Sequence, residues 1–592
     1  MAVLMGRAGV ALAFPFFDPT NADNVPGAAP LGTDLPEADV AGLRNQLRLV
    51  NPGAPGNPSA WTIIPRLTIQ QLFTDNAYEV TSPRSADAVT VLAPGIKILA
   101  DTTRLQLSLD YQPNLLLHAI NGPLNSMTQQ LNATGLITVV PDFAYVDVTA
   151  LSGVQSRLGA LAGAGTLGAA GAGAGAATAA NAAGYGTGEG LNRNNEVQTS
   201  SFGISPYLLR QLGDYGSVKL GASVNAASYS TISGFAASPF PTGGGTNSSS
   251  LLTTEQIAHY SSGQFLNKLQ YALDIDLQQS HTDTGATPVT VGTTTATTPG
   301  TSFTSERQTF NNQLSYALNR NLTLLGAIGE QHIQYSGGQA QTISGLIWNV
   351  GFTYVPNPDS SITLTYGHLN GTNSIQANGF IAVGGRSQIT FNYSNTVGTQ
   401  LENLQNQLNN AITNGQGGLT NAQSGGQALT GINALGVQTG VYRFNTFTSS
   451  FSTQFSRDTL SLSLTWSEQT SVNPAVSTSN SPVTTSTVGV DSNGIPIIIS
   501  TNGPASDAWT GGVSWIHLLS EDLTLSSSAS YSVIHRSGGL NDGSLSTAVG
   551  LQYLLSPTTT LSARYSFFDR VSKIPGYSLY ENLLLLGLTK QF

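Results

Sequence analysis

The sequence has no cysteine, few charged residues and no long apolar run, and each absence excludes a class of protein. Without cysteine there is no disulfide scaffold, thiolate metal site or cysteine nucleophile. Charged residues make up 9% of the 592 residues, against about 25% in a typical soluble protein, so few large soluble surfaces could be built from this chain. No run of about 18 apolar residues occurs, which excludes membrane-spanning helices.

The charge that is present is acidic. The formal net charge is -10, from 22 Lys and Arg against 32 Asp and Glu, and no basic patch occurs along the chain. This balance argues against nucleic acid as a partner. Hydrophobic residues still make up 40%, so the sequence favours apolar residues that alternate with Ser, Thr, Asn and Gln rather than apolar blocks.

Alternation with a period of two follows from residue 61 onward. Leu105, Leu107, Leu109 and Tyr111, for example, alternate with polar residues, which predicts strands with one apolar and one polar face. Single-chain bacterial barrels use an even number of strands. Because some of the segments should join into one strand or form no strand, we expect about 18 to 20 strands. The segments are 61–73, 88–100, 102–113, 126–140, 141–151, 196–211, 216–230, 250–263, 267–281, 303–318, 320–335, 341–355, 359–371, 384–396, 441–455, 457–470, 508–519, 522–535, 540–556, 557–571 and 577–592.

The connections between these segments are of two kinds. Short, turn-like connections alternate with long Gly, Ser, Thr and Asn stretches, which is the polarity of an outer-membrane barrel. Two insertions, 157–190 and 397–440, are candidate plugs or lids. The second opens with a helical stripe of apolar residues, Leu401, Leu404, Leu408, Ala411 and Ile412.

A strand with one apolar face fits either a soluble sandwich or a membrane barrel. The length of the segments, the aromatic residues near their ends and the terminal strand favour the membrane barrel, with a secreted β-repeat or adhesin as the alternative. We therefore predict an all-β fold, a transmembrane antiparallel up-and-down β-barrel in the bacterial outer membrane over residues 61–592, with long loops at one rim. Its apolar faces would contact outer-membrane lipid.

Residues 1–60 are expected to form an N-terminal arm. The part from residue 18 is a Pro-rich linker, and an apolar stretch after Arg7 with Ala11 and Ala13 resembles the end of a secretory signal. Three interpretations stay open: a clipped or misassigned start, a mature arm, and a disordered tail.

Charged residues on polar faces are the candidate functional residues. Arg or Lys facing lipid near the midplane would cost about 2–4 kcal/mol, so these side chains should line the lumen. They would either form cross-strand ion pairs or a constriction that filters solutes. The candidate lumen-lining residues are Arg66, Arg104, Asp110, Lys268, Asp274, Asp276 and Arg564.

No catalytic, cofactor or metal motif is found. The residues from Gly163 to Gly168 match G-x-G-x-x-G but lie in an Ala/Gly run without a flanking βαβ unit. The seven histidines are scattered singly and are interpreted as loop or rim residues. We expect no enzymatic activity, no cofactor and no metal.

The end of the chain resembles the signal that the barrel-assembly machinery reads on bacterial β-barrels. Every second residue back from the C-terminus is largely apolar, and the last one is aromatic. This predicts the assembly machinery as a partner, with the signal carried by Tyr580, Leu584, Leu586, Leu588 and Phe592.

Short motifs over most of the chain from Trp61 resemble a family of outer-membrane β-barrel porins associated with exosortase/PEP-CTERM exopolysaccharide loci. They are Ile64-Pro65-Arg66-Leu67, Phe73-Thr74-Asp75-Asn76, Ser85-Ala86-Asp87, Ala93-Pro94-Gly95-Ile96, Gly135-Leu136-Ile137, Pro141-Asp142-Phe143, Ile204-Ser205-Pro206-Tyr207, Gly213-Asp214-Tyr215, the Gln/Leu-rich insert after Thr399, Asn582 and Phe592. The resemblance implies a large barrel and a part in polysaccharide export, and brings no catalytic residue. We therefore expect a passive water-filled channel with exopolysaccharide as its solute. The alternatives are a general porin for small solutes and a surface adhesin or structural barrel.

Overall fold

The structure, a computed structural model, describes the barrel and part of its loops. The described residues are 61–156, 196–232, 248–284, 287–291, 294–298, 301–337, 340–409, 411–413, 419–421, 440–472, 485–490, 496–500, 506–536, 541–573 and 578–592. The predicted arm at 1–60, the insertion at 157–190 and the Gly163 to Gly168 pattern lie outside them.

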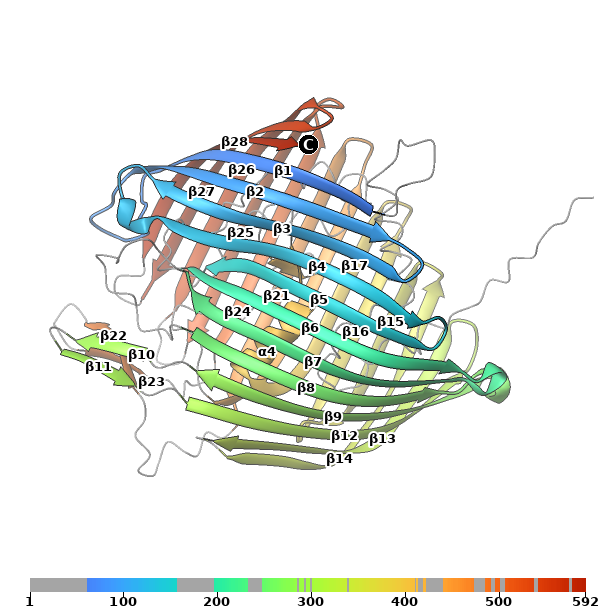
Figure 1. The fold of residues 1–592 in the computed structure, drawn as a ribbon. Helices are drawn as coiled ribbons and strands as arrows, with labels where there is room; N and C mark the ends of the chain where they lie inside the picture. Colours follow the sequence, from blue (N-terminus) through green and yellow to red (C-terminus); the bar gives the residue numbers. More distant parts are fainter. Residues whose placement is uncertain are drawn as a thin grey trace, which may run out of the picture.

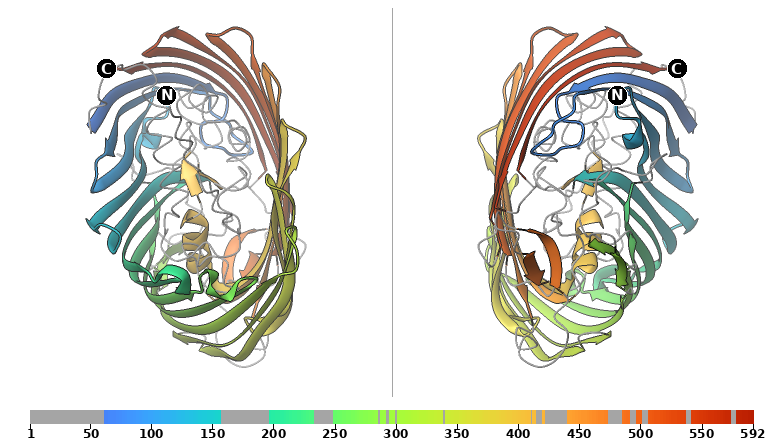
Figure 2. Two further views of the ribbon diagram at one scale, coloured as in Figure 1. Left: turned by 90° about the vertical axis from the view of Figure 1, so that its right-hand side faces the viewer. Right: turned by 90° about the vertical axis from the view of Figure 1, so that its left-hand side faces the viewer.

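One antiparallel sheet of 22 strands closes on itself, because the first strand pairs with both the second and the last (Figures 1 and 2). The predicted fold class is confirmed. The strands are β1 (Trp61–Thr74), β2 (Asp87–Asp101), β3 (Leu105–His118), β4 (Ser126–Val140), β5 (Ala144–Ser156), β6 (Glu196–Gln211), β7 (Ser217–Thr231), β8 (Ser248–Ser261), β9 (Leu269–Thr284), β12 (Thr301–Ala317), β13 (Leu322–Gly337), β14 (Gln341–Asn357), β15 (Ser360–Leu369), β16 (Thr372–Val383), β17 (Ser387–Thr399), β20 (Val441–Gln454), β21 (Asp458–Ser471), β24 (Ser506–Leu518), β25 (Leu523–Arg536), β26 (Asp542–Ser556), β27 (Thr559–Ser572) and β28 (Leu579–Gln591).

The remaining elements lie in the connections. Three small hairpins pair β10 (Thr287–Val291) with β11 (Thr294–Thr298), β18 (Ala411–Thr413) with β19 (Leu419–Asn421), and β22 (Thr485–Val490) with β23 (Pro496–Ser500). The helices are α4 (Gln400–Asn409) and the 3-10 turns η2 (Gly122–Leu124), η4 (Gly213–Tyr215) and η5 (Gln264–Leu266). Within the described ranges, no helix has the length and apolarity that crossing a bilayer requires.

The expected number of about 18 to 20 strands is too low, and the strand missing from the prediction is β16. Asn370 and Gly371, both with positive φ, make the two-residue turn between β15 and β16, and this dipeptide is a strong hairpin signal. The alternation in β16 is obscured because Gly379 takes an outward position and Phe380 an inward one, in register with Thr390 of β17.

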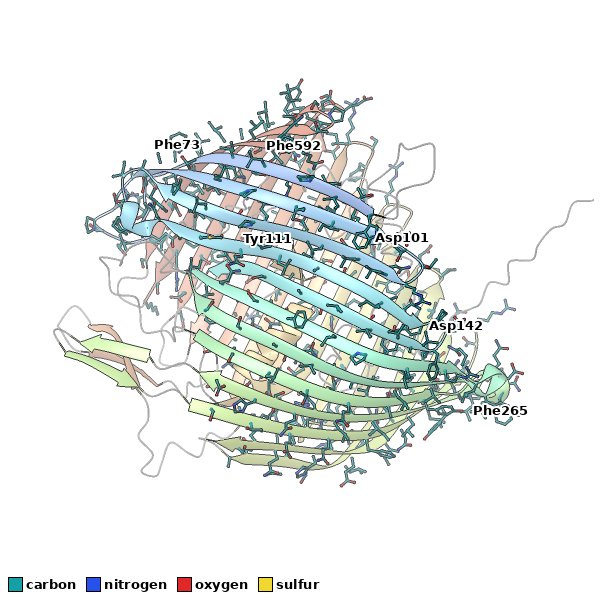
Figure 3. The ribbon with its side chains drawn as sticks, viewed as in Figure 1. Phe73, Asp101, Tyr111, Asp142, Phe265 and Phe592 are labelled. Atoms are coloured by element: carbon teal, nitrogen blue, oxygen red, sulfur yellow. The ribbon has the colours of Figure 1, made fainter. Side chains whose placement is uncertain are left out.

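The two rims differ as the sequence predicts. At the rim that holds the C-terminus, all connections are short, from two residues between β26 and β27 to seven between β8 and β9. The long connections, including the one that carries α4, leave from the other rim. Figure 3 shows Asp101 and Asp142 at the rim of short turns and Phe73 near the opposite rim. Short turns are periplasmic in outer-membrane barrels, so the long loops face the outside.

Burial alternates along each strand and separates an outer from an inner face. On the two closing strands, the outward residues Ile69, Phe73, Leu584, Leu586 and Leu588 are each 40–46% exposed. Most of their neighbours on the inner face are buried, and Gly587 and Thr589 beside Leu588 are partly buried. Large side chains that expose this much apolar surface around a closed sheet need lipid as their solvent.

The closing seam is fastened at its outer end by the first loop, 75–86. The Asp75 carboxylate accepts hydrogen bonds from the Asn582 backbone N–H (2.9 Å) and side-chain amide (2.8 Å). The Asn76 amide donates to the Tyr580 carbonyl at 3.0 Å. We call Asp75, Asn76, Tyr580 and Asn582 the seam clamp.

Candidate functional site in the barrel interior

Arg66 makes a three-strand contact on the inner face of β1–β3. Its guanidinium donates to both carboxylate oxygens of Asp110 (2.8 and 2.6 Å) and to the Gln112 side-chain oxygen (2.7 Å). Gly95 of β2 lies opposite Arg66, and a Cβ there would come within 2.7 Å of the Arg66 Nε. The missing side chain therefore lets the guanidinium cross β2 and bind β3 in the bidentate geometry that carboxylates favour.

A second polar group lies on the inner face of β8, β9 and β12. The Nδ1 of His259 contacts Asp274 directly across the β8–β9 pair, and the Gln313 amide donates to the other oxygen of Asp274 at 2.9 Å. Asp274 and Asp276 are both buried on the same face of β9. This part of the wall concentrates buried hydrogen-bonding groups.

The other predicted lumen residues occupy different places. Arg104 and Lys268 lie in the short turns just before β3 and β9, where both are exposed, because β3 begins at Leu105 and β9 at Leu269, three and two residues later than the predicted segments 102–113 and 267–281. Arg564 is half-buried on the inner face of β27, between Ser562 and Ser566. The seven residues are thus spread over separate parts of the wall and its rim.

Two of the histidines interpreted as loop or rim residues belong to the inner wall. His118 at the end of β3 contacts Asp87 with its Nδ1 at 3.0 Å, and His259 contacts Asp274. Both are buried. His259 and Gln112 could have been found from the alternation, because His259 lies on an inward position of the strand next to Asp274 and Gln112 lies two residues after Asp110 on the same face of β3.

The residues of the predicted assembly signal share the outer face of the last strand. Tyr580, Leu584, Leu586 and Leu588 are 40–46% exposed there, and Phe592, directly after β28, is 72% exposed. None of these side chains takes part in the apolar clusters of the interior. Their placement leaves them available to a partner on the lipid side.

Helix α4 begins without a linker after β17. Thr399, the last residue of β17, accepts a hydrogen bond from the Glu402 N–H at 3.2 Å, and the Glu402 carboxylate accepts one from the Thr399 N–H at 2.7 Å. This reciprocal pair is a capping box, in which two backbone donors at the start of the helix gain partners. The predicted helical stripe after Thr399 is thus present as a helix with a fixed start as far as Leu408, whereas Ala411 and Ile412 belong to the short strand β18.

The apolar stripe of α4 packs against the inside of the barrel wall. Figure 2 shows the helix within the ring of strands. Leu401, Leu404 and Leu408 are 1%, 3% and 2% exposed. They form one buried cluster with residues of β5 to β8, namely Leu151, Val197, Ala227, Tyr229 and Leu251.

Polar contacts fasten the same segment to other strands. The Thr253 hydroxyl donates to the Gln405 side-chain oxygen at 2.9 Å, which ties α4 to β8. Just before the helix, the Val397 carbonyl accepts from the Arg307 guanidinium (2.8 Å) and from the Tyr335 hydroxyl (3.4 Å). Residues 397–408 are therefore held to the wall at several points. Among the residues that the structure describes, no group of three or more His, Cys, Asp or Glu side chains could hold a metal ion.

No family model matches the chain and no curated protein is similar to it, so the resemblance to exosortase-associated porins stays a prediction. Solved structures do match. The FrpB iron transporter from Neisseria meningitidis (F5-1 variant) shares 9% identity at a TM-score of 0.47, over 93% of this chain and 84% of that one. The open form of the ferric-catecholate import receptor Fiu from E. coli K12 shares 11% at 0.48, over 91% and 82%.

The siderophore receptor PiuA from Acinetobacter baumannii shares 8% identity at a TM-score of 0.43, over 89% of this chain and 82% of that one. These similarities concern the fold. The closed sheet, its apolar outer face and the polarity of its rims indicate one setting, the outer membrane. The chain is an outer-membrane β-barrel.

The expectation of a passive water-filled channel is wrong, whether for exopolysaccharide export or as a general porin. The matched structures are named as an iron transporter, an import receptor and a siderophore receptor. Outer-membrane transporters with 22 strands have a plugged lumen, and in this chain α4 occupies part of the interior. The same finding replaces the alternative of an adhesin or structural barrel.

Proposed function

We propose that this protein is a gated outer-membrane transporter, in which α4 obstructs the outer part of the lumen and must leave the wall before a ligand passes. The observation that carries the proposal is the burial of Leu401, Leu404 and Leu408 against the inner wall. A loop that merely covered the rim would not need an apolar stripe packed against the inner wall.

The contacts of α4 with the wall can keep the helix docked, and they are few enough for the helix to leave the wall. Burying each leucine contributes about 1.5–3 kcal/mol, and this gain is opposed by the cost of ordering the ten-residue helix. The capping box between Thr399 and Glu402 lies within the segment, so it can persist when the helix leaves the wall. The helix could therefore move as a unit, with the end of β17 as its pivot.

The test is to tie α4 to the wall. Because the chain has no cysteine, the double variant Thr253→Cys/Gln405→Cys introduces the only thiols, at two positions whose native side chains are hydrogen-bonded. The thiols are joined by oxidation or by a short dithiol linker, and KCl conductance is recorded in planar bilayers. We expect the joined form to lose the openings that the reduced form shows.

Each single-cysteine variant, treated in the same way, is the control. Equal conductance of the joined and the reduced double variant would reject the gate. The expectation that the protein is not an enzyme stays a prediction.

A further inference from the structure

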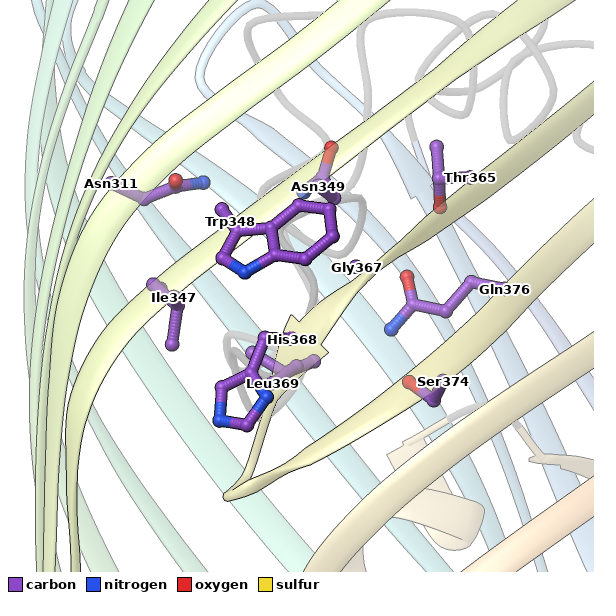
Figure 4. A pocket seen from close by; sticks show the side chains of 10 residues that line it. All are labelled: Asn311, Ile347, Trp348, Asn349, Thr365, Gly367, His368, Leu369, Ser374 and Gln376. Atoms are coloured by element: carbon purple, nitrogen blue, oxygen red, sulfur yellow. The ribbon is translucent and has the colours of Figure 1, made fainter.

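The turn between β15 and β16 is buried within the wall. Its first residue, Asn370, is 0% exposed, whereas a turn at the rim of a barrel would face water. Figure 4 shows the two strands that it joins, with Leu369 before the turn and Ser374 after it. Pairing of β16 with β17 ends at Ala377 and Tyr393, so the start of β16 around Ser374 does not pair with β17. The buried turn thus lies where these two strands have separated.

The outer end of β17 packs against β13, although β14, β15 and β16 separate the two strands in the sheet. Val397 of β17 belongs to one buried cluster with Ile333 and Tyr335 of β13. On the neighbouring strand β20, Arg443 lies directly opposite Val397. The guanidinium of Arg443 is therefore close to the region in which β13, β17 and the buried turn meet.

Asn370 connects β13 with β20 through its backbone. Its N–H donates to the Gln331 side-chain oxygen of β13 at 3.2 Å. Its carbonyl oxygen accepts from the Arg443 Nη2 of β20 at 3.3 Å. Gln331 is 2% exposed, so this junction is closed off from water on the side of β13.

Three nitrogen donors at this junction are buried without a hydrogen-bond partner among the residues that the structure describes. They are the Arg443 Nε, the Gln331 Nε2 and the Asn370 Nδ2, and we call these three side chains the donor cluster. The Arg443 Nε shares its carbon atom with Nη2, and the Gln331 Nε2 shares its carbon with the oxygen that Asn370 contacts. All three donors therefore lie around Asn370, and the Asn370 Oδ1 is the one unpaired acceptor of the cluster.

Arg443 also lacks the carboxylate that two other arginines of the wall have. Arg66 is bound to Asp110 and Arg570 to Asp542. No Asp or Glu of the described residues lies within 4.0 Å of the Arg443 guanidinium, whose recorded partner is the Asn370 carbonyl. Charged side chains in protein interiors are nearly always paired. The described chain thus supplies a positive charge here without its counterion.

The excess of donors and the unbalanced charge define the class of ligand. A water molecule brings no charge, so it would leave the guanidinium without a counterion. An anion can accept from all three donors and compensate Arg443 at the same time. The burial of Asn370 and Gln331 favours a compact ion. We propose that the donor cluster is a binding site for a small inorganic anion such as chloride. The bound ion would join β13, β20 and the buried turn.

The probe is chloride, exchanged against gluconate at constant ionic strength, with the full chain refolded in detergent. Thermal unfolding is followed by the fluorescence of the five tryptophans. We expect the unfolding temperature to rise with chloride and to saturate, with a total shift of about 2 °C or more. Arg443→Gln should abolish this shift. The matched control is Arg66→Gln, which removes an arginine that has its own carboxylate and should keep the full dependence on chloride.

A second variant separates binding from the folding of the turn. Asn370 has a φ of 52°, which glycine adopts readily, so Asn370→Gly keeps both backbone contacts and removes one donor of the cluster. It should raise the half-saturating chloride concentration about tenfold.

Two results would overturn the site. One is a wild-type unfolding temperature that does not respond to chloride, and the other is an equal response of Arg443→Gln and Arg66→Gln. If Arg443→Gln does not refold, Asn370→Gly decides, and an unchanged half-saturating concentration would then reject the site. No conductance enters these measurements, so the anion site and the gate succeed or fail separately.

Discussion

Leu404→Ala should raise the fraction of time that the barrel conducts. Leu404 is 3% exposed and lies in the buried cluster with Tyr229 and Leu251 of the wall. Truncating a buried leucine to alanine costs about 2–5 kcal/mol. Here the substitution destabilises only the docked state, because in the released state residue 404 is exposed to water in the wild type and in the variant. If the docked state loses about 3 kcal/mol, the ratio of docked to released helix falls about a hundredfold.

The assay is single-channel recording in planar bilayers at fixed salt, with open probability as the readout. Leu401→Ala/Leu404→Ala should increase it further, and Asn403→Ala should not, because Asn403 is half-buried on α4 outside the apolar cluster. All variants must first show the heat-modifiable gel mobility of a folded barrel. The reasoning is refuted if Leu404→Ala folds normally and its open probability equals that of the wild type.

Three further predictions concern the wall. Gly95→Val should push the Arg66 guanidinium away from β3, because the new Cβ would lie 2.7 Å from its Nε. We expect the free energy of unfolding to fall by about 1–3 kcal/mol and the barrel to unfold at a lower temperature in a gel-shift assay. An unchanged unfolding temperature would contradict the contact. Leu586→Arg should destabilise the barrel by up to about 2–4 kcal/mol, because the arginine would face lipid. Ser562→Arg, on the inner face, should destabilise it by less, as measured by guanidinium unfolding in lipid. Equal losses would contradict the assigned faces. Phe592→Ala should lower outer-membrane levels in cells while refolding in detergent normally, and normal levels would remove Phe592 from the assembly signal.

Local alternation predicted the fold because lipid imposes it on every strand. In β21 the outward Leu462 and Leu464 and the inward Ser463 and Thr465 follow directly from a period of two. The prediction failed at β16, because Phe380 takes an inward position, in register with Thr390, and Gly379 an outward one, which breaks the alternation of apolar and polar residues. The Asn370-Gly371 dipeptide carried the missing information, because its two positive φ angles specify a two-residue turn.

The functional residues were harder to predict because their partners come from other strands. Parity placed Arg66 and Asp110 on polar faces, but their contact requires Gly95 on the strand between them, which local alternation does not reveal. The spacing of Leu401 and Leu404 predicted a helix. It could not show that the apolar side of that helix packs on β5 to β8, since the complementary surface exists only once the barrel has closed.

The seam clamp joins residues made at opposite times in synthesis. Asp75 and Asn582 are separated by 507 positions, so the carboxylate leaves the ribosome long before its two donors. A chain without β28 would keep the Asp75 carboxylate and the Asn76 amide but lack their partners, and unpaired polar groups of this kind destabilise the fold. The outer end of the seam therefore distinguishes chains that contain β28 from chains that lack it, at a point that faces the exterior of the cell.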